Sequence, residues 1–250
     1  YTAAMTLHRI LACVVAVAAL AAARPSGAAA DPYAGVRAEF RSALAAAGTA
    51  ATDVPAAPDS ESLLSYPLYA YLQAARLQRR LGDPAAAVAI EAFLTEHGDA
   101  PAARSLRRSW LMTLAASKAW EPYLAAYRED VDDSVAARCN ALAARVALGR
   151  TDGLAEAVTA TYLSAKSLPP ACDPAFEWLR AQGLLTPTLI EQRARLALVA
   201  GEAALARFLA RSLPEAQASP INQWAALIEQ PRTAIEALIA TPARPVETEA

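Results

Sequence analysis

The chain has 250 residues and a formal net charge of −2, and 55% of its residues are hydrophobic against 19% charged. Its basic pairs, Arg79-Arg80 and Arg107-Arg108, are isolated, so the sequence makes no electrostatic case for nucleic-acid binding. Alanine, the best helix former, is the most abundant residue, and long alternations of Val, Ile and Thr are missing. This composition predicts an all-α protein.

The first 30 residues have the organisation of a secretory signal peptide. Met5 is the expected start, and a basic end with His8 and Arg9 precedes the uninterrupted apolar run Ile10–Ala23. That run is shorter than the roughly 20 residues of a membrane-spanning helix, and an Ala-x-Ala cleavage site follows it. We expect cleavage before Asp31 and export, with no membrane attachment afterwards. A retained anchor is the alternative.

Amphipathic patterns separated by Gly, Asp-Pro and Thr-Pro follow the signal and predict helices. The first is expected at 31–47 and is followed by a loop at 48–59. Four more are expected at 60–81, 85–96, 102–116 and 120–127, before an acidic loop at 128–133. The side chains expected to be buried are large and apolar: Val36, Phe40, Leu44, Tyr69, Leu72, Leu77, Val88, Phe93, Leu94, Leu106, Trp110, Leu111 and Leu114.

Two cysteines bracket the next part of the chain, which reads as a helical hairpin at 136–148 and 154–165. Two antiparallel helices joined by a tight turn return the chain to its starting end, so Cys139 and Cys172 could form a disulfide. Such a bond would stabilise the fold by about 3–4 kcal/mol through loop entropy. Two buried free thiols are the alternative. Cys13 leaves with the signal, and an even pair in an oxidising compartment favours the disulfide.

Five further helices are expected in the rest of the chain, and Asp173 and Thr186, each followed by Pro, are expected to cap the first two. The tail Thr241–Ala250 is rich in Pro and Glu and is expected to be unstructured. The helices are expected at 175–182, 188–200, 202–212, 219–229 and 232–239.

Helices this short cannot bury their apolar stripes alone. Stacked as successive antiparallel pairs they share a continuous core, which predicts an α-superhelix over residues 31–240. A globular bundle is the alternative, but it usually contains fewer and longer helices. The 34-residue spacing of tetratricopeptide repeats does not recur in the sequence.

Few residues suit a catalytic, cofactor or metal site. His97 is the one histidine left after signal cleavage, so a zinc site lacks ligands, and no Gly-rich phosphate loop follows a strand. The acidic loop at 128–133 lacks the spacing of a calcium loop. Glycoside chemistry needs a carboxylic acid with a raised pKa. Residue type alone offers Glu61, Glu91, Glu177 and Glu191. The residues alone therefore predict a scaffold or binding module.

A series of short motifs carries a resemblance to a known family. Together they resemble the N-terminal superhelical region of the soluble lytic murein transglycosylases, over about Leu63 to Pro231. The motifs, in chain order, are Ser65-Tyr66-Pro67-Leu68-Tyr69-Ala70-Tyr71, Pro101-Ala102-Ala103-Arg104-Ser105-Leu106, Trp120, Ala136-Ala137-Arg138-Cys139-Asn140, Ser164 through Asp173 with Phe176, Arg193-x-Arg195-Leu196-Ala197, and Gly201.

The resemblance implies a right-handed α-superhelix of stacked antiparallel helix pairs, U- or ring-shaped, with a structural disulfide between Cys139 and Cys172 in the periplasm. Members of the family cleave the MurNAc–GlcNAc bond of peptidoglycan and leave a 1,6-anhydro end. A separate C-terminal lysozyme-like domain with one catalytic Glu does this work, and its Glu-Ser and Gly-Leu-Met-Gln motifs mark it. The only Glu-Ser pair here is Glu61-Ser62, near the N-terminus, and Gly-Leu-Met-Gln is missing. We therefore expect the chain to stop within the superhelical region, so no catalytic residue is carried over.

Two functions remain open at this point. In the first, the chain is the superhelical part of a periplasmic lytic transglycosylase, a monomer that needs no cofactor and holds peptidoglycan glycan strands without cleaving them. In the second, it is a stand-alone secreted helical-repeat adaptor that binds a protein partner.

Overall fold

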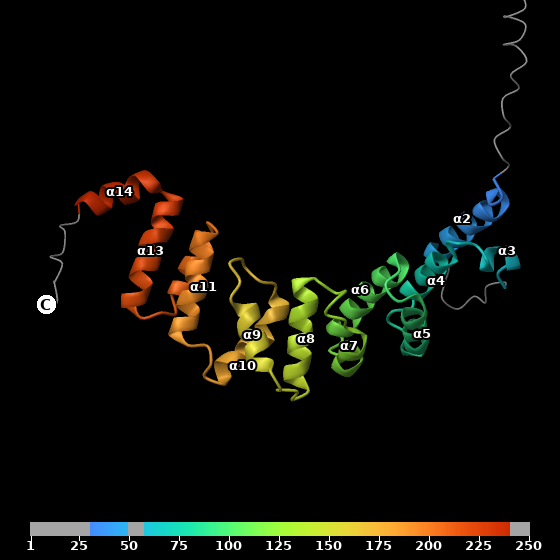
Figure 1. Cartoon of the computed structure of the whole chain (residues 1–250), viewed down its shortest axis with the longest axis horizontal. Coiled ribbons are helices and arrows are strands. Elements are labelled where there is room, and N and C mark those ends of the chain that lie inside the picture. The colour runs from blue at the N-terminus through green and yellow to red at the C-terminus, as the bar shows by residue number, and fades with distance from the viewer. Residues whose placement is uncertain (1–30, 50–57, 241–250) are drawn as a thin grey trace, which may run out of the picture. The chain divides into compact units, whose positions relative to one another are not determined.

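A computed structural model describes residues 31–49 and 58–240, and this part of the chain is helical (Figure 1). Thirteen α-helices and two 3-10 turns lie in these ranges, and no strand is found there. The prediction of an all-α protein is confirmed for the described residues. The expected signal peptide at 1–30 and the expected unstructured tail at 241–250 lie outside them. No helix within them is long and apolar enough to cross a membrane.

The chain divides into two compact units between Leu72 and Gln73, within helix α4 (Tyr69–Gln78). The first unit contains α2 (Ala34–Thr49) and α3 (Glu61–Leu64) before the start of α4. The second contains the rest of the described chain.

Aromatic rings form the centre of the first unit. The ring of Tyr66 is buried and lies 5.7 Å from that of Tyr33 and 5.2 Å from that of Phe40. The buried positions of α2 are Phe40 and Ala47, which are seven residues apart on one helical face. Leu44 is 36% exposed, so the expectation that it is buried is wrong.

The single helix expected at 60–81 is also wrong, because a turn around Pro67 interrupts it. Proline has no N–H to donate and disfavours helical backbone in the residue before it. Helix α3 therefore ends at Leu64 after one turn. Its start agrees with the sequence, since the side chain of Ser60 accepts a hydrogen bond from the backbone N–H of Leu63 at 3.1 Å.

The second unit is a series of short helices in the order of the chain. Their bounds are η1 (Pro84–Ala86), α5 (Ala87–His97), α6 (Pro101–Ala116), α7 (Trp120–Ala126), α8 (Val135–Ala147), α9 (Leu154–Tyr162), η2 (Pro170–Cys172), α10 (Asp173–Ala181), α11 (Pro187–Val199), α12 (Ala203–Ala210), α13 (Glu215–Glu229) and α14 (Pro231–Ala240).

Helices of the second unit pack mainly on their neighbours in the chain. Helix α5 contacts α6, α6 contacts α7, α7 contacts α8, and α8 contacts both α9 and α10 (Figure 1). Further on, α11, α12 and α13 all contact one another, and α13 contacts α14. This is the arrangement expected when short helices bury their apolar stripes against one another.

Alanine forms much of this unit's core. One cluster of buried residues runs from Leu142 to Ala225 and includes contributions from α8 through α13. The side chain of alanine is a single methyl group, so alanine at a contact between two helices lets their axes approach closely. The alanines with no exposed surface in this cluster are Ala175, Ala194, Ala197, Ala206 and Ala225.

Three predictions at helix starts and faces are corrected. Val88 was expected to point inward and is 77% exposed, because α5 buries Ile90, Phe93 and Leu94 instead. Asp173 caps no helix with its side chain, since the turn η2 leads directly into α10. Helix α13 begins four residues before the expected start at 219.

Candidate functional site

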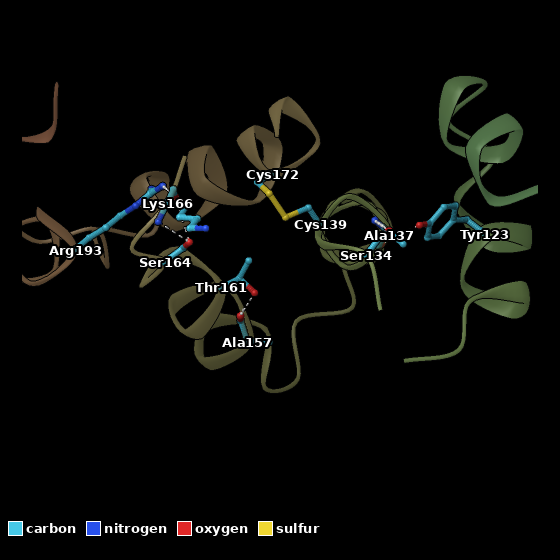
Figure 2. The surroundings of a disulfide bond; sticks show 10 residues. All are labelled: Tyr123, Ser134, Ala137, Cys139, Ala157, Thr161, Ser164, Lys166, Cys172 and Arg193. Carbon is cyan, nitrogen blue, oxygen red and sulfur yellow. Dashed lines mark hydrogen bonds between the residues drawn. A yellow bond between two sulfur atoms is a disulfide. The ribbon is translucent and has the colours of Figure 1, made fainter. Parts of the chain in front are cut away.

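A disulfide joins Cys139 on α8 to Cys172 at the end of η2, and both residues are fully buried (Figure 2). The two are 33 residues apart in the chain, so the bond closes the open end of the hairpin formed by α8 and α9. The turn between these helices uses Gly149 and Gly153 with φ of 67° and 62°. Residues with a Cβ rarely adopt this left-handed backbone, which explains glycine at both positions.

Tyr123 connects the hairpin to the helix before it. Its hydroxyl donates a hydrogen bond to the backbone carbonyl of Ala137 at 2.8 Å, from α7 to α8 (Figure 2). The side chain has no exposed surface, and burial raises its pKa above the usual tyrosine value. The phenol therefore serves as a neutral donor that fixes α7 against α8, the helix that carries Cys139.

Arg193 on α11 connects the other side of the hairpin. Its guanidinium lies 4.6 Å from the centre of the Tyr162 ring and 5.8 Å from that of Phe176. Its Nη2 donates to the backbone carbonyl of Lys166 at 3.4 Å, in the loop that follows α9 (Figure 2). The residue is only 6% exposed, and burial lowers its pKa.

The segment at 163–169 is a loop, although the sequence predicted helix for its first three residues. Helix α9 was expected to reach Ala165 but ends at Tyr162. A local turn then takes over, because the hydroxyl of Ser164 accepts from the backbone N–H of Lys166 at 3.2 Å and donates to its carbonyl at 3.1 Å. This turn presents the Lys166 carbonyl that Arg193 binds.

A groove of about 900 Å³ opens beside Arg193, between α10 and α12. Ile190 and Arg193 contribute to it from α11, which lies between the other two helices in the chain. Its apolar lining includes two phenylalanine rings, and that of Phe208 is 60% exposed. Its aromatic and charged lining residues are Tyr162, Asp173, Phe176, Glu177, Arg180, Arg193, Phe208 and Arg211.

Charges of both signs line this groove. Arg180 on α10 and Arg211 at the end of α12 are exposed, and neither forms an ion pair within the described part of the chain. The guanidinium of Arg211 lies 5.2 Å from the centre of the Phe208 ring. Asp173 and Glu177, both exposed, add two carboxylates on the α10 side. The arrangement can bind a ligand that carries carboxylates and an ammonium group.

The glutamates considered for glycoside chemistry are not assembled into an acid–base site. Glu61, Glu91 and Glu177 are exposed on separate helices. Glu191 accepts hydrogen bonds from Arg195 and from Gln217, each at 2.7 Å, and these contacts lower its pKa. A general acid needs the opposite shift, so this carboxylate is a structural ion-pair partner.

The acidic loop and His97 likewise form contacts within the protein. Arg128 binds the carboxylate of Asp130 at 2.8 Å and holds the pKa of that carboxyl below its usual value. The backbone N–H of Arg128 donates to Asp132 at 2.9 Å. The ring of His97 lies 4.3 Å from that of Phe93. Within the described ranges no cluster of His, Cys, Asp and Glu has the size of a metal site.

Buried arginines are the feature that sequence reasoning missed. Arg193 occupies a position on the apolar stripe of α11, three residues after Ile190 and followed by Ala194 and Ala197. Arg107 takes the same kind of position on α6, where its Nη2 donates to the carbonyl of Gly98 at 3.2 Å. An arginine at a position of the apolar stripe could have indicated a buried guanidinium. Charged residues are almost never fully buried without a partner, so such a position also predicts a contact for the charge.

Comparisons with known proteins support the resemblance. No family model matches the chain. The soluble lytic murein transglycosylase of Salmonella typhimurium is 32% identical over 152 residues, covering 61% of this chain and 23% of that protein. The soluble lytic murein transglycosylase of Escherichia coli K12 is 29% identical over 173 residues, covering 69% of this chain and 26% of that protein. The chain thus spans about a quarter of the length of these relatives.

Solved structures agree. The 70-kDa soluble lytic transglycosylase in complex with bulgecin A matches with a TM-score of 0.66 and 27% identity, over 86% of this chain and 34% of that chain. The lytic transglycosylase Slt from Pseudomonas aeruginosa matches with a TM-score of 0.64 and 26% identity, over 80% of this chain and 32% of that chain. The resemblance predicted from the motifs is confirmed over a segment of these proteins.

Proposed function

We propose that this chain, which is homologous to one part of the soluble lytic murein transglycosylases, is the helical, non-catalytic portion of such an enzyme. In this function it works in the periplasm as a monomeric scaffold that holds peptidoglycan glycan strands. Cleavage of the MurNAc–GlcNAc bond belongs to a separate lysozyme-like domain. The scaffold itself requires neither a cofactor nor a metal ion.

One observation carries the proposal: the similarity in sequence and structure extends over most of this chain but only about a quarter to a third of each relative. A match of this kind supports a shared helical segment and does not extend to the relatives' whole activity. Glu191 agrees with a scaffold, because its contacts with Arg195 and Gln217 lower its pKa, whereas a glycosidic acid needs a raised one.

The proposed compartment and architecture rest on the same homology to the soluble lytic murein transglycosylases. Residues 1–30 act as a cleaved signal peptide, and the helices that follow Leu72 form a right-handed superhelix of antiparallel helix pairs. The disulfide supports an oxidising compartment, because such bonds persist in the periplasm and are rare in the cytosol. Packing of each helix on its chain neighbours supports the superhelix.

The test uses the full chain, exported by a Gram-negative host and purified from its periplasm. Incubated with isolated peptidoglycan sacculi, it should sediment with them and release no 1,6-anhydro-muropeptides. An unrelated exported helical protein of similar net charge is the control for non-specific sedimentation.

Two results contradict the proposal in different ways. Release of anhydro products by the purified chain would show that it carries a catalytic centre of its own. Failure to sediment above the control would remove the glycan-binding scaffold and favour the adaptor that binds a protein partner.

A further inference from the structure

The groove between α10 and α12 offers guanidinium groups from both of its sides. Arg180 comes from α10, Arg211 from the end of α12, and the buried Arg193 from α11. Arginine presents several N–H donors in a planar fork that matches the two oxygens of a carboxylate. Because Arg180 and Arg211 have no ion-pair partner among the described residues, their donors are available to a ligand.

Arg211 also packs on an aromatic ring of the groove. Its guanidinium lies over the exposed ring of Phe208 at 5.2 Å, and this contact restricts a side chain that would otherwise sample many rotamers. Binding to a restricted donor loses less conformational entropy than binding to a free one. The Phe208 side chain is 60% exposed and is therefore accessible to apolar groups of a ligand.

The carboxylates in the groove narrow the ligand class. Asp173 and Glu177 line the groove from α10, the helix that also carries Arg180, so a polyanion such as a nucleic acid meets repulsion as well as attraction. A ligand that carries both free carboxylates and a free ammonium group is complementary to both signs. Short aliphatic side chains would contact Phe176, Leu205 and Phe208.

We propose that this groove binds the peptide stems of peptidoglycan, through their free carboxylates on Arg180 and Arg211 and their free ammonium group on Asp173 and Glu177. The inference rests on the proposed scaffold function and names the part of the polymer that the scaffold recognises. A volume of about 900 Å³ suits a short peptide, since ligand pockets usually measure about 300–1,000 Å³. The glycan strand is then held through its peptides.

The first experiment compares two polymers with the exported full chain. One is intact sacculi, and the other is glycan strands from which an amidase has removed the peptides. The chain should bind the intact polymer about tenfold more tightly, a difference of about 1.4 kcal/mol. The soluble stem tripeptide should compete for the intact polymer and leave any binding to stripped strands unchanged.

The second experiment reverses charge at the two exposed arginines. Arg180→Glu combined with Arg211→Glu should lower affinity for intact sacculi at least about tenfold and leave binding to stripped strands unchanged. Arg232→Glu, a reversal of an exposed arginine on α14 outside the groove, is the control for general charge, with half the charge change of the double variant, and should change affinity less than twofold. All three positions are exposed, and circular dichroism should show the helix content of each variant to be that of the unmutated chain.

The outcomes separate the two proposals. Equal binding to intact and stripped polymer, with no effect of the tripeptide, overturns the peptide site and leaves the glycan scaffold standing. Loss of binding in the Arg232 control equal to that in the groove variant also overturns the peptide site, since general charge then explains the attraction. Binding to neither polymer overturns the scaffold function and the peptide site together.

Discussion

Arg193 joins helix α11 to the loop that follows α9, and its burial has a desolvation cost. Removing a guanidinium from water is unfavourable, and the lowered pKa of this residue has the sign of that desolvation. The rings of Tyr162 and Phe176 and the carbonyl of Lys166 replace part of the lost hydration. These contacts fix the position of α11 relative to the loop that follows α9.

Replacement of Arg193 separates packing from charge. Arg193→Ala should lower the free energy of unfolding by about 2–4 kcal/mol, since it leaves a cavity and removes the ring contacts. Arg193→Met, which keeps most of the volume, should recover more than half of that loss. Chemical denaturation measures both, with Arg232→Ala on the exposed face of α14 expected within about 0.5 kcal/mol of the unmutated chain. A stable Arg193→Ala variant would contradict the joining function.

Burial of Tyr123 should make the fold less stable at alkaline pH. Burial raises its pKa above the ordinary tyrosine value of about 10 in the folded chain, so the unfolded chain loses the phenolic proton first. Stability is therefore complete below about pH 10 and falls as the pH rises above it. Tyr162 and Tyr127, whose pKa values are also raised by burial, contribute in the same direction.

The Tyr123→Phe variant tests this linkage. It should lose about 1 kcal/mol at neutral pH, because the carbonyl of Ala137 loses its donor. Above pH 10 its free energy of unfolding should fall less steeply than that of the unmutated chain, by up to about 1.4 kcal/mol per pH unit. Denaturation curves between pH 7 and 11 give both quantities. Parallel pH profiles would exclude Tyr123 as the titrating group.

The elements show which local signals predict helix ends. Helix α11 begins one residue from its expected start, because the side chain of Thr186 accepts from the N–H of Leu189 at 3.2 Å as a cap. Where tertiary contacts decide, prediction failed: α9 ends before Ala165, and the stripe of α5 excludes Val88. The groove could not be predicted, because it depends on the placement of α10 against α12 and no sequence pattern encodes that distance.

The disulfide is the strongest constraint on any one element. Closing a loop with a sequence separation of 33 removes entropy from the unfolded chain worth about 3–4 kcal/mol. Cys139→Ala with Cys172→Ala should therefore lower the free energy of unfolding by about that amount and preserve the helix content. Reduction of the unmutated chain should give the same loss, and reduction of the variant should give none. Free thiols in the folded exported chain would contradict the bond.

At the scale of the whole molecule, alanine connects composition to architecture. An alanine-rich sequence favours helix locally, and the same methyl groups form the fully buried contacts among α10, α11, α12 and α13. Composition and helix length predicted the all-α class for this reason. The division at Leu72 and Gln73 was not predicted, because α4 continues through it without a change in the sequence pattern.

The division predicts two separable unfolding transitions. Every tryptophan lies after Leu72, at Trp110, Trp120, Trp178 and Trp224, so tryptophan fluorescence reports on the second unit, while far-UV circular dichroism follows the helices of both. Reduction of the disulfide should lower the fluorescence midpoint by roughly 10 °C, since the bond lies in the second unit. Part of the dichroism signal should unfold at an unchanged temperature, because both cysteines of the disulfide, Cys139 and Cys172, lie in the second unit. If the complete dichroism signal instead shifts with the fluorescence in one step, the two units unfold cooperatively and the contact boundary at Leu72 has no thermodynamic counterpart.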